Sequence, residues 1–213
     1  MFRQIFDSAH QSVYAVFSDT FLGTAFSVHR DGYLATARHV VSHLAGQQVG
    51  IMQTVGGRRQ LAATIVRDDL ATDLALLRLS ERTGQVASLD LSPIPALYGQ
   101  SVLVMGYPCT YRSVDSALQG RPMVNLRING CTVASDISLP AFDETDSISV
   151  EAFEVDSNLH PGMSGAPVVD MSGRVVGIVS RGFWRQSAKP YLEESDYTVA
   201  VRAQHLVPLL SCL

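Results

Sequence analysis

Three residue types that could together perform acyl transfer stand far apart in this sequence. Ser164 lies in a glycine-rich turn, Pro161–Gly165, just before an apolar run, and His39 and Asp73 lie upstream of it. A serine hydroxyl is a poor nucleophile at neutral pH and needs a base that takes its proton during attack. An imidazole with a pKa of about 6.5 is mostly neutral near pH 7 and suits that role, and a buried carboxylate fixes its tautomer. The set therefore favours catalysis by a serine nucleophile.

Taken singly, each of these residues has an ordinary structural explanation. Pro161–Gly165 could be a surface turn, His39 a structural histidine at the end of an apolar strand, and Asp73 a turn residue before the next strand. Asp68 and Asp69 compete with Asp73 for the carboxylate role, but neither leads directly into an apolar strand. The three residues together point to catalysis by a serine nucleophile more specifically than any one of them does alone.

The serine turn also offers backbone donors for a developing negative charge. Gly162 can adopt a backbone conformation that other residues avoid, so its N–H and that of Ser164 can point into one pocket. In one measured enzyme such a donor contributes about 3–4 kcal/mol to the transition state. Gly162 and Ser164 are therefore the candidate oxyanion hole.

Composition narrows the function class. The chain has 213 residues, 46% of them hydrophobic and 17% charged, with a formal net charge of −4, which is ordinary for a globular protein with a full core. No basic run invites nucleic acid, and no apolar stretch approaches the roughly 20 residues of a membrane helix. We therefore expect neither nucleic acid nor a membrane as partner, and no metal or organic cofactor.

The cysteines and the first residues bear on location. Cys109, Cys131 and Cys212 are an odd number without metal-type spacing, which favours a reducing compartment. The segment Met1–Asp7 lacks the apolar core of a secretory signal, although trimming at this end is left open. The expected location is the cytoplasm.

Short apolar runs bounded by Gly, Asp, Pro or Ser dominate the chain and are typical of strands. The predicted strands are Val13–Phe17, Leu22–Val28, Tyr33–Thr36, Val49–Thr54, Leu61–Val66, Leu74–Leu79, Ser101–Gly106, Met123–Ile128, Ser149–Val155, Ala166–Val169, Arg174–Ser180 and Tyr197–Val201. Short helices are predicted at Phe2–Gln11, His39–Leu44 and Ala203–Leu210. Arg30–Tyr33 predicts a hairpin turn whose Asp-Gly pair supplies the positive φ angles, and the acidic stretch Asp136–Asp146 predicts an exposed loop.

The strands fall into two similar halves. The stretch Ser88–Gly99 carries two prolines and little periodicity, and it is the predicted linker. We expect units at 1–90 and 100–213 that together form one functional body. Many short strands in two halves favour paired antiparallel barrels or sandwiches.

The chain resembles chymotrypsin-fold serine proteases of the HtrA type, as a peptidase domain without a PDZ domain. The resemblance runs from about Ser12 to Leu210 and is carried by Gly23–Phe26, Asp31–Val41, Thr72–Leu77, Asp156–Pro167 and Gly177–Gly182. It implies an all-β fold of two packed antiparallel six-stranded barrels with a short C-terminal helix. The first barrel would carry His39 and Asp73, and the second would carry Ser164.

The resemblance also implies a role for each site residue. His39 would be the general base, Asp73 its orienting carboxylate and Ser164 the nucleophile, with Gly162 and Ser164 as the oxyanion hole. The Ser180 carbonyl and the Gly182 backbone would hold an extended peptide by strand addition.

Three residues bear on substrate choice. Asn158 would lie at the base of the primary specificity pocket, where a neutral side chain disfavours Lys or Arg. Leu159 beside it favours small or medium uncharged side chains. Arg181 stands where an aromatic residue often lines the groove.

Two departures from the family pattern stand out. Met163 occupies the position where digestive relatives carry an aspartate that captures a new N-terminus, so activation by that ion pair is excluded. Arg38 replaces a small residue beside the base, and the sequence gives no account of it. The oxyanion turn must therefore be stable by itself or be ordered by a partner.

The predicted function is a serine endopeptidase that cuts protein or peptide substrates through an acyl-enzyme. Met163 and the long segment Tyr111–Asp156 favour a latent state released by a regulatory partner protein or a specific substrate. The alternative is a catalytically silent module that binds extended peptides. An α/β-hydrolase esterase is rejected, because that fold requires Gly-x-Ser-x-Gly and the order Ser, Asp, His.

Overall fold

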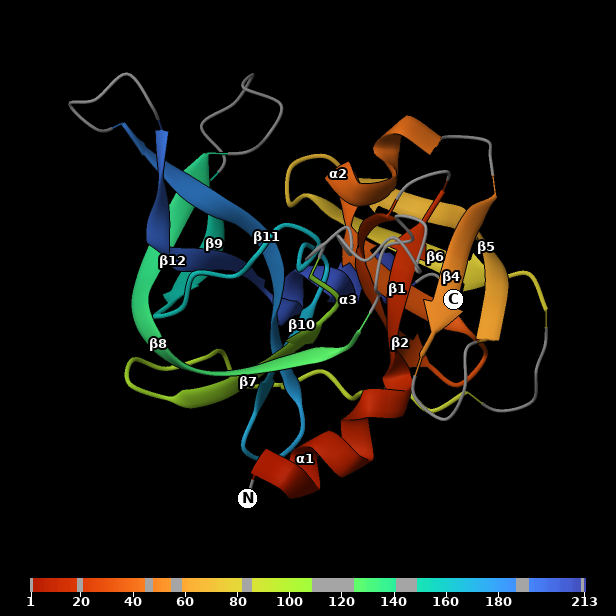
Figure 1. The fold of residues 1–213 in the computed structure, drawn as a ribbon, viewed down its shortest axis with the longest axis horizontal. Helices are drawn as coiled ribbons and strands as arrows, with labels where there is room; N and C mark the ends of the chain where they lie inside the picture. The colour runs from red at the N-terminus through yellow and green to blue at the C-terminus, as the bar shows by residue number, and fades with distance from the viewer. Residues whose placement is uncertain are drawn as a thin grey trace, which may run out of the picture.

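The computed structural model describes residues 2–18, 21–44, 48–54, 59–81, 86–108, 125–140, 149–186, 192–211 and 213, and their side chains except those of residues 21, 22 and 181–196. The strands of this part form two closed antiparallel barrels that lie side by side (Figure 1). The predicted pair of six-stranded barrels is confirmed, and the sandwich alternative is wrong. Closure pairs every strand on both sides and leaves no sheet edge open.

The first barrel contains β1 (Val13–Phe17), β2 (Phe21–His29), β3 (Tyr33–Ala37), β4 (Val49–Gln53), β5 (Arg59–Asp69) and β6 (Leu74–Leu79). Its strand order is β1-β2-β3-β6-β5-β4. The second barrel contains β7 (Ser101–Gly106), β8 (Arg127–Pro140), β9 (Ser149–Val155), β10 (Pro167–Asp170), β11 (Val175–Gln186) and β12 (Leu192–Arg202). Its order, β10-β11-β12-β9-β8-β7, repeats the connectivity of the first barrel around the ring.

Short helices flank the barrels. They are α1 (Phe2–Ala9) with η1 (His10–Ser12), α2 (Arg38–Val41) with η2 (Ser42–Leu44), and η4 (Ala203–Leu206) with α3 (Val207–Leu210). The three helical segments predicted from the sequence are thus confirmed. The N-terminal helix reaches the second barrel, since a Cβ built on Gly130 of β8 would lie 3.5 Å from the Phe2 ring. At the other end of the chain, α3 contacts β5 of the first barrel.

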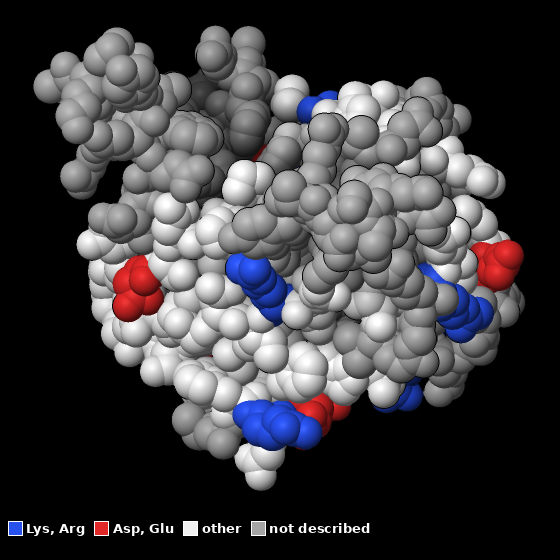
Figure 2. Space-filling model, in the orientation of Figure 1, with Lys and Arg blue, Asp and Glu red and all other residues white. Residues whose placement is uncertain are grey.

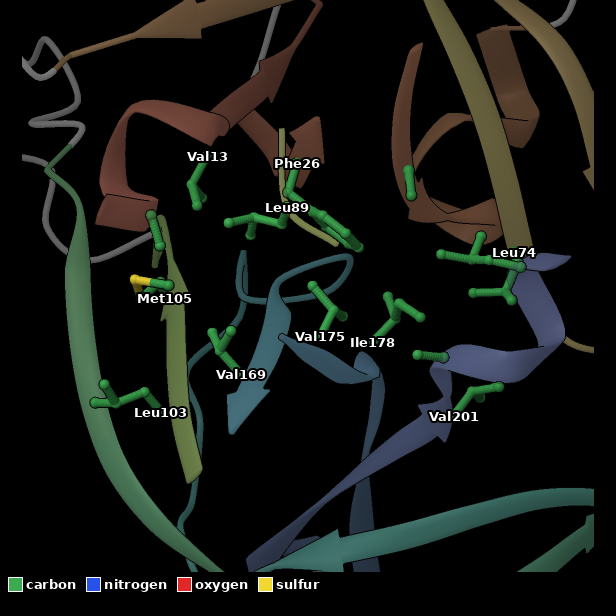
Figure 3. Packing of buried hydrophobic residues seen from close by; sticks show 14 of the residues in the cluster. Val13, Phe26, Leu74, Leu89, Leu103, Met105, Val169, Val175, Ile178 and Val201 are labelled. Atoms are coloured by element: carbon green, nitrogen blue, oxygen red, sulfur yellow. The ribbon is translucent and has the colours of Figure 1, made fainter. Parts of the chain in front are cut away.

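Within the described part of the chain, three apolar clusters form the core. One fills the first barrel, around Leu34 and Ile51, and one fills the second, around Phe153 and Val168. The third joins residues of both barrels (Figure 3). Its labelled members are Val13, Phe26 and Leu74 from the first barrel, Leu89 from the connection, and Leu103, Met105, Val169, Val175, Ile178 and Val201 from the second.

The sequence predictions fail locally in two places. In the turn between β2 and β3, only Gly32 has a positive φ, of 83°, and Asp31 does not. The three residues between the paired ends His29 and Tyr33 allow a wider turn than the predicted two-residue hairpin. The predicted acidic loop is also wrong at its start, because residues 136–140 belong to β8 and pair with β9, while 141–146 lie outside the described residues. There, alternate polar side chains face outward from a paired strand.

Two more predictions are refined. The strand predicted at Met123–Ile128 begins at Arg127, and residues 123 and 124 lie outside the described part. The linker Ser88–Gly99 is irregular but tied to the second barrel, because Ser92 N donates to the Val175 carbonyl at 2.8 Å and Val175 N donates to the Asp90 carbonyl at 2.9 Å.

Candidate active site

The predicted base stands on the short helix that follows β3. The chain leaves the strand through extended backbone at Ala37 and turns at once into α2. This places His39 at the end of the barrel with its side chain 43% exposed. A histidine here can meet the barrel behind it with one ring nitrogen and face solvent with the other.

The predicted carboxylate stands in the turn between β5 and β6. The Asp73 side chain is only 3% exposed, and Asp73 is the one non-glycine residue with positive φ, 57°, among those that the structure describes. Aspartate tolerates this conformation better than most residues. Asp69 shapes the turn by accepting hydrogen bonds from Ala71 N at 3.0 Å and Thr72 Oγ1 at 2.7 Å.

The Asp73 carboxylate is aimed at the histidine. Its Oδ1 accepts the His39 backbone N–H at 2.9 Å, and its Oδ2 lies 2.7 Å from His39 Nδ1. Because a carboxylate accepts and does not donate, this contact puts the proton on Nδ1 and leaves Nε2 free to act as a base. The structure therefore brings the predicted His39 and Asp73 together.

The two competing carboxylates have other partners. Asp68 Oδ2 lies 2.5 Å from Arg38 Nε in an ion pair at the end of β5, and Asp69 is used by the turn. The Arg38 backbone N–H also donates to the Asp73 carbonyl at 2.7 Å. Arg38, which the sequence left unexplained, thus ties the histidine helix to the end of β5 through its side chain and to the aspartate turn through its backbone.

The serine turn is held on several sides. Met163 N donates to the His160 carbonyl at 3.1 Å, Ala166 N to the Met163 carbonyl at 2.9 Å, and Gly165 N to the Val179 carbonyl at 2.7 Å. Gly162 and Gly165 have positive φ angles of 94° and 83°. Met163 is 2% exposed and packs in the core of the second barrel. An apolar anchor therefore stands where an ion pair was excluded.

The two candidate oxyanion donors are not hydrogen-bonded to other described residues. The N–H groups of Gly162 and Ser164 make no hydrogen bond to any residue that the structure describes, whereas the N–H groups of Met163 and Gly165, beside them, do. Gly162 and Ser164 therefore lie in one turn with donors available for an incoming oxygen.

Ser180 contacts Asp73 and Ser164, two of the three predicted catalytic residues. Its hydroxyl donates to Asp73 Oδ2 at 2.6 Å, and its carbonyl accepts the Ser164 hydroxyl at 3.3 Å. Within the described ranges, no hydrogen bond joins the Ser164 hydroxyl to the His39 ring. The resting hydroxyl is thus directed at the Ser180 carbonyl, in the same cluster as the histidine and the aspartate.

The sequence analysis missed the Ser180 hydroxyl, because it assigned only the backbone of this residue to substrate binding. The signal was available: Ser180 is a single hydroxyl at the end of the apolar run Val175–Val179. It is 1% exposed, and a buried hydroxyl needs a partner.

The residues predicted to select the substrate are placed only in part. Asn158 is exposed and Leu159 is half-buried against the core of the second barrel. Their segment is fixed by Thr198, whose Oγ1 accepts Leu159 N at 3.0 Å and donates to the Ser157 carbonyl at 2.8 Å. The sequence analysis missed this threonine as well.

Arg181 and Gly182 lie on β11 and pair with β12, opposite Val199 and Thr198. Their side chains lie outside the described part of the structure. On the face shown in Figure 2, the described Lys and Arg side chains stand apart from one another and form no single basic patch.

Two features are absent from the described residues. These residues contain no group of three His, Cys, Asp or Glu side chains arranged to hold a metal ion. Nor do they contain a helix of the length and apolarity needed to cross a membrane.

The chain is similar to known proteins in both sequence and structure. Residues 23–178 match the family described as "Trypsin-like peptidase domain". The "Probable periplasmic serine endoprotease DegP-like" of Pseudomonas putida (strain GB-1) is 31% identical over 165 residues, which make up 77% of this chain and 30% of that protein. "Uncharacterized protein y4bJ" of Sinorhizobium fredii is 30% identical over 158 residues, or 74% of this chain and 21% of that protein. The chain thus spans less than a third of the length of these relatives.

Among solved structures, the active form of the Rv3671c protease from M. tuberculosis matches with a TM-score of 0.73 at 22% identity, covering 97% of this chain and 82% of that one. Its inactive form matches with a TM-score of 0.72 at 22% identity, covering 98% and 92%. Deg5 matches with a TM-score of 0.70 at 20% identity, covering 97% and 90%. These likenesses establish the fold, and the two forms of one protease fit almost equally well.

Proposed function

Because the chain belongs to the trypsin-like peptidase family, we propose that it is a serine endopeptidase that works through His39, Asp73 and Ser164. The observation that carries this proposal is the 2.7 Å contact between His39 Nδ1 and the buried Asp73 carboxylate. It leaves Nε2 as the nitrogen that can accept the serine proton.

The reaction follows from these positions. The Ser164 oxygen attacks the carbonyl carbon of the scissile peptide bond as its proton passes to His39 Nε2, and the N–H groups of Gly162 and Ser164 face the oxyanion. The C–N bond then breaks as His39 gives the proton to the leaving amine, and the acyl group stays on Ser164 as an ester. Water, deprotonated by His39, hydrolyses the ester and frees the serine.

Latency forms the second part of the proposal. The hydrogen bond from the Ser164 hydroxyl to the Ser180 carbonyl, at 3.3 Å, supports a resting state in which the nucleophile is turned away from its base. A peptide strand that pairs with β11 at Ser180 supplies an N–H that competes for this carbonyl. Substrate then releases the serine hydroxyl toward His39, either alone or with the help of a regulatory partner protein.

The same observation favours one alternative function. A serine held permanently on the Ser180 carbonyl would leave a silent groove that binds extended peptides without cutting them. In that case the wild type binds peptide and takes up no fluorophosphonate.

The decisive experiment is labelling with a fluorophosphonate probe, followed by mass spectrometry of the modified peptide. Labelling at Ser164 that is lost in Ser164→Ala, with the thermal unfolding of the two proteins matched, supports the endopeptidase. Its rate should fall as the pH drops, because a protonated imidazole has no lone pair for the serine proton. A folded wild type that is not labelled at Ser164 refutes the proposal.

Three further parts remain predictions. Asn158 and Leu159 favour an uncharged residue before the cut bond, and a cleavage profile dominated by Lys or Arg would contradict this. Equal turnover of the purified chain with and without lysate would remove the need for a partner. The cytoplasmic location is tested by cell fractionation.

A further inference from the structure

Thr24 is a polar side chain at the seam between the two barrels. It lies on β2 and is 0% exposed. Its neighbour Ala25 belongs to the core of the first barrel, whereas Phe26, two residues along from Thr24, belongs to the cluster shared by both barrels. Since alternate residues of a strand point to opposite faces, Thr24 points with Phe26 toward the second barrel.

Every hydrogen-bonding group of Thr24 has a partner. Its hydroxyl donates to the Gly162 carbonyl at 2.9 Å and accepts the Tyr107 N–H at 2.9 Å. Its backbone N–H donates to the Ser164 carbonyl at 2.9 Å. Its own carbonyl accepts the Thr36 hydroxyl at 2.7 Å.

Two of these contacts fall on the oxyanion turn in a specific way. Gly162 and Ser164 are the residues whose N–H groups form the candidate oxyanion hole, and Thr24 binds the carbonyl oxygen of each. Binding those oxygens limits rotation of the peptide groups that directly follow Gly162 and Ser164. The backbone contact to Ser164 is available to any residue, but the contact to Gly162 requires a hydroxyl.

We propose that Thr24 is a positioning residue, which holds the oxyanion turn in its donor-ready shape from the neighbouring barrel. The expected effect of Thr24 on turnover rests on the proposed function. The expected effect of Thr24 on the shape of the turn does not. Met163 supplies the apolar half of the anchor, since its sulfur lies 2.9 Å from a Cβ built on Gly106, beside Thr24 Oγ1 at 3.0 Å. The turn is thereby fixed without an ion pair.

Thr24→Val is the main test, because it keeps the size and the β-branch and removes only the hydroxyl. Direct loss of an oxyanion donor costs about 10²–10³ in kcat, so we expect an indirect loss of about tenfold, with KM within about twofold of wild type. The substrate is a fluorogenic peptide taken from the wild-type cleavage profile. Thr24→Ser keeps the hydroxyl and should restore kcat.

A second readout reports on the turn without turnover. Met163 N–H and Gly165 N–H are hydrogen-bonded within and beside the turn, so in Thr24→Val their hydrogen exchange should speed up at least tenfold while the Val168 amide of β10 is unchanged. The control is Ser27→Ala on the same strand. Ser27 is 0% exposed, and its hydroxyl bonds locally, to the His29 carbonyl at 3.3 Å, so loss of this hydroxyl should leave kcat and the turn amides unchanged.

The outcomes separate this inference from the proposed function. A wild type without Ser164-dependent activity refutes the endopeptidase, and the exchange rates still decide the role of Thr24. Unchanged exchange at Met163 and Gly165 in Thr24→Val overturns the inference, as does a Thr24→Ser variant that is equally impaired, or a loss confined to KM. If Thr24→Val does not fold, Thr24→Ala compared with Thr24→Ser tests the same hydroxyl, since both lack the methyl group.

Discussion

Replacing Gly165 by alanine probes how tightly the serine turn is fitted against the first barrel. A Cβ at Gly165 would lie 2.1 Å from the Thr24 carbonyl oxygen and 2.4 Å from Thr36 Oγ1. The Thr24 carbonyl belongs to the backbone of β2, so the contact cannot be relieved by a side-chain rotation. The turn itself has to move away from the strand.

The cost of this substitution has two parts. A φ of +83° at Gly165 is a left-handed conformation that costs an L-residue roughly 1–2 kcal/mol. Moving the turn also weakens the bonds from Thr24 N to the Ser164 carbonyl and from Gly165 N to the Val179 carbonyl, each worth about 1 kcal/mol. The free energy of unfolding should fall by about 3–4 kcal/mol, which lowers Tm by about 10 °C in a chain of this size.

Gly173→Ala is the matched control. Gly173 has a φ of +85°, and a Cβ there would meet nothing within 4 Å. Only the conformational cost of roughly 1–2 kcal/mol applies, and fluorophosphonate labelling should stay as in wild type. Thermal unfolding followed by circular dichroism measures both variants. If Gly165→Ala is no less stable than Gly173→Ala and is labelled equally fast, the reasoning about the fit of the turn is refuted.

Three other predictions follow from buried groups. Ser180→Ala removes the hydroxyl bonded to Asp73 at 2.6 Å, a bond to a charged group worth about 1.5–3 kcal/mol, so the labelling rate should fall by about tenfold or more. An unchanged rate would contradict a positioning role for this hydroxyl. Burial raises the pKa of Tyr14 to about 12, above its value in the unfolded chain. The contribution of this group to the free energy of unfolding is therefore fully present below about pH 10 and is lost as the pH rises toward 12. In urea unfolding, this group should contribute about 1.4 kcal/mol less to the free energy of unfolding at pH 11 than at pH 8. An equal fall between these pH values in a Tyr14→Phe variant would argue against Tyr14 as the cause. Burial also raises the pKa of the Cys131 thiol to about 11, so iodoacetamide at pH 8 should modify Cys131 far more slowly in the folded chain than in urea, as peptide mass spectrometry would report; equal rates would speak against burial.

The parts of the site that the sequence predicted are those that depend on local order along the chain. Asp73 was preferred to Asp68 and Asp69 because it directly precedes an apolar strand, and that position puts it in the turn beside His39. Likewise, the alternation and bounding residues of short strands predict most of the barrels. These signals lie within a few residues of the feature that they predict.

Two contacts of the site that the sequence did not predict join segments from different barrels. The Ser180 hydroxyl reaches Asp73 across 107 residues, and Thr24 reaches Gly162 across 138. Such contacts depend on how two separately closed barrels dock, which spacing along the chain does not encode. The type of the turn at Gly32 was missed for a smaller reason, since Asp-Gly fits both a two-residue and a longer hairpin loop.

The apolar cluster shared by the barrels has a consequence for how the protein is made. Val13, Phe26 and Leu74 are synthesised well before Ile178 and Val201, which belong to the same cluster in the finished molecule. The ribosome adds roughly 5–20 residues per second. The apolar surface of the first half therefore stays exposed for on the order of 10 s before the second half is synthesised. Until the second barrel is made, the nascent chain exposes an apolar surface of the kind that favours association with other chains.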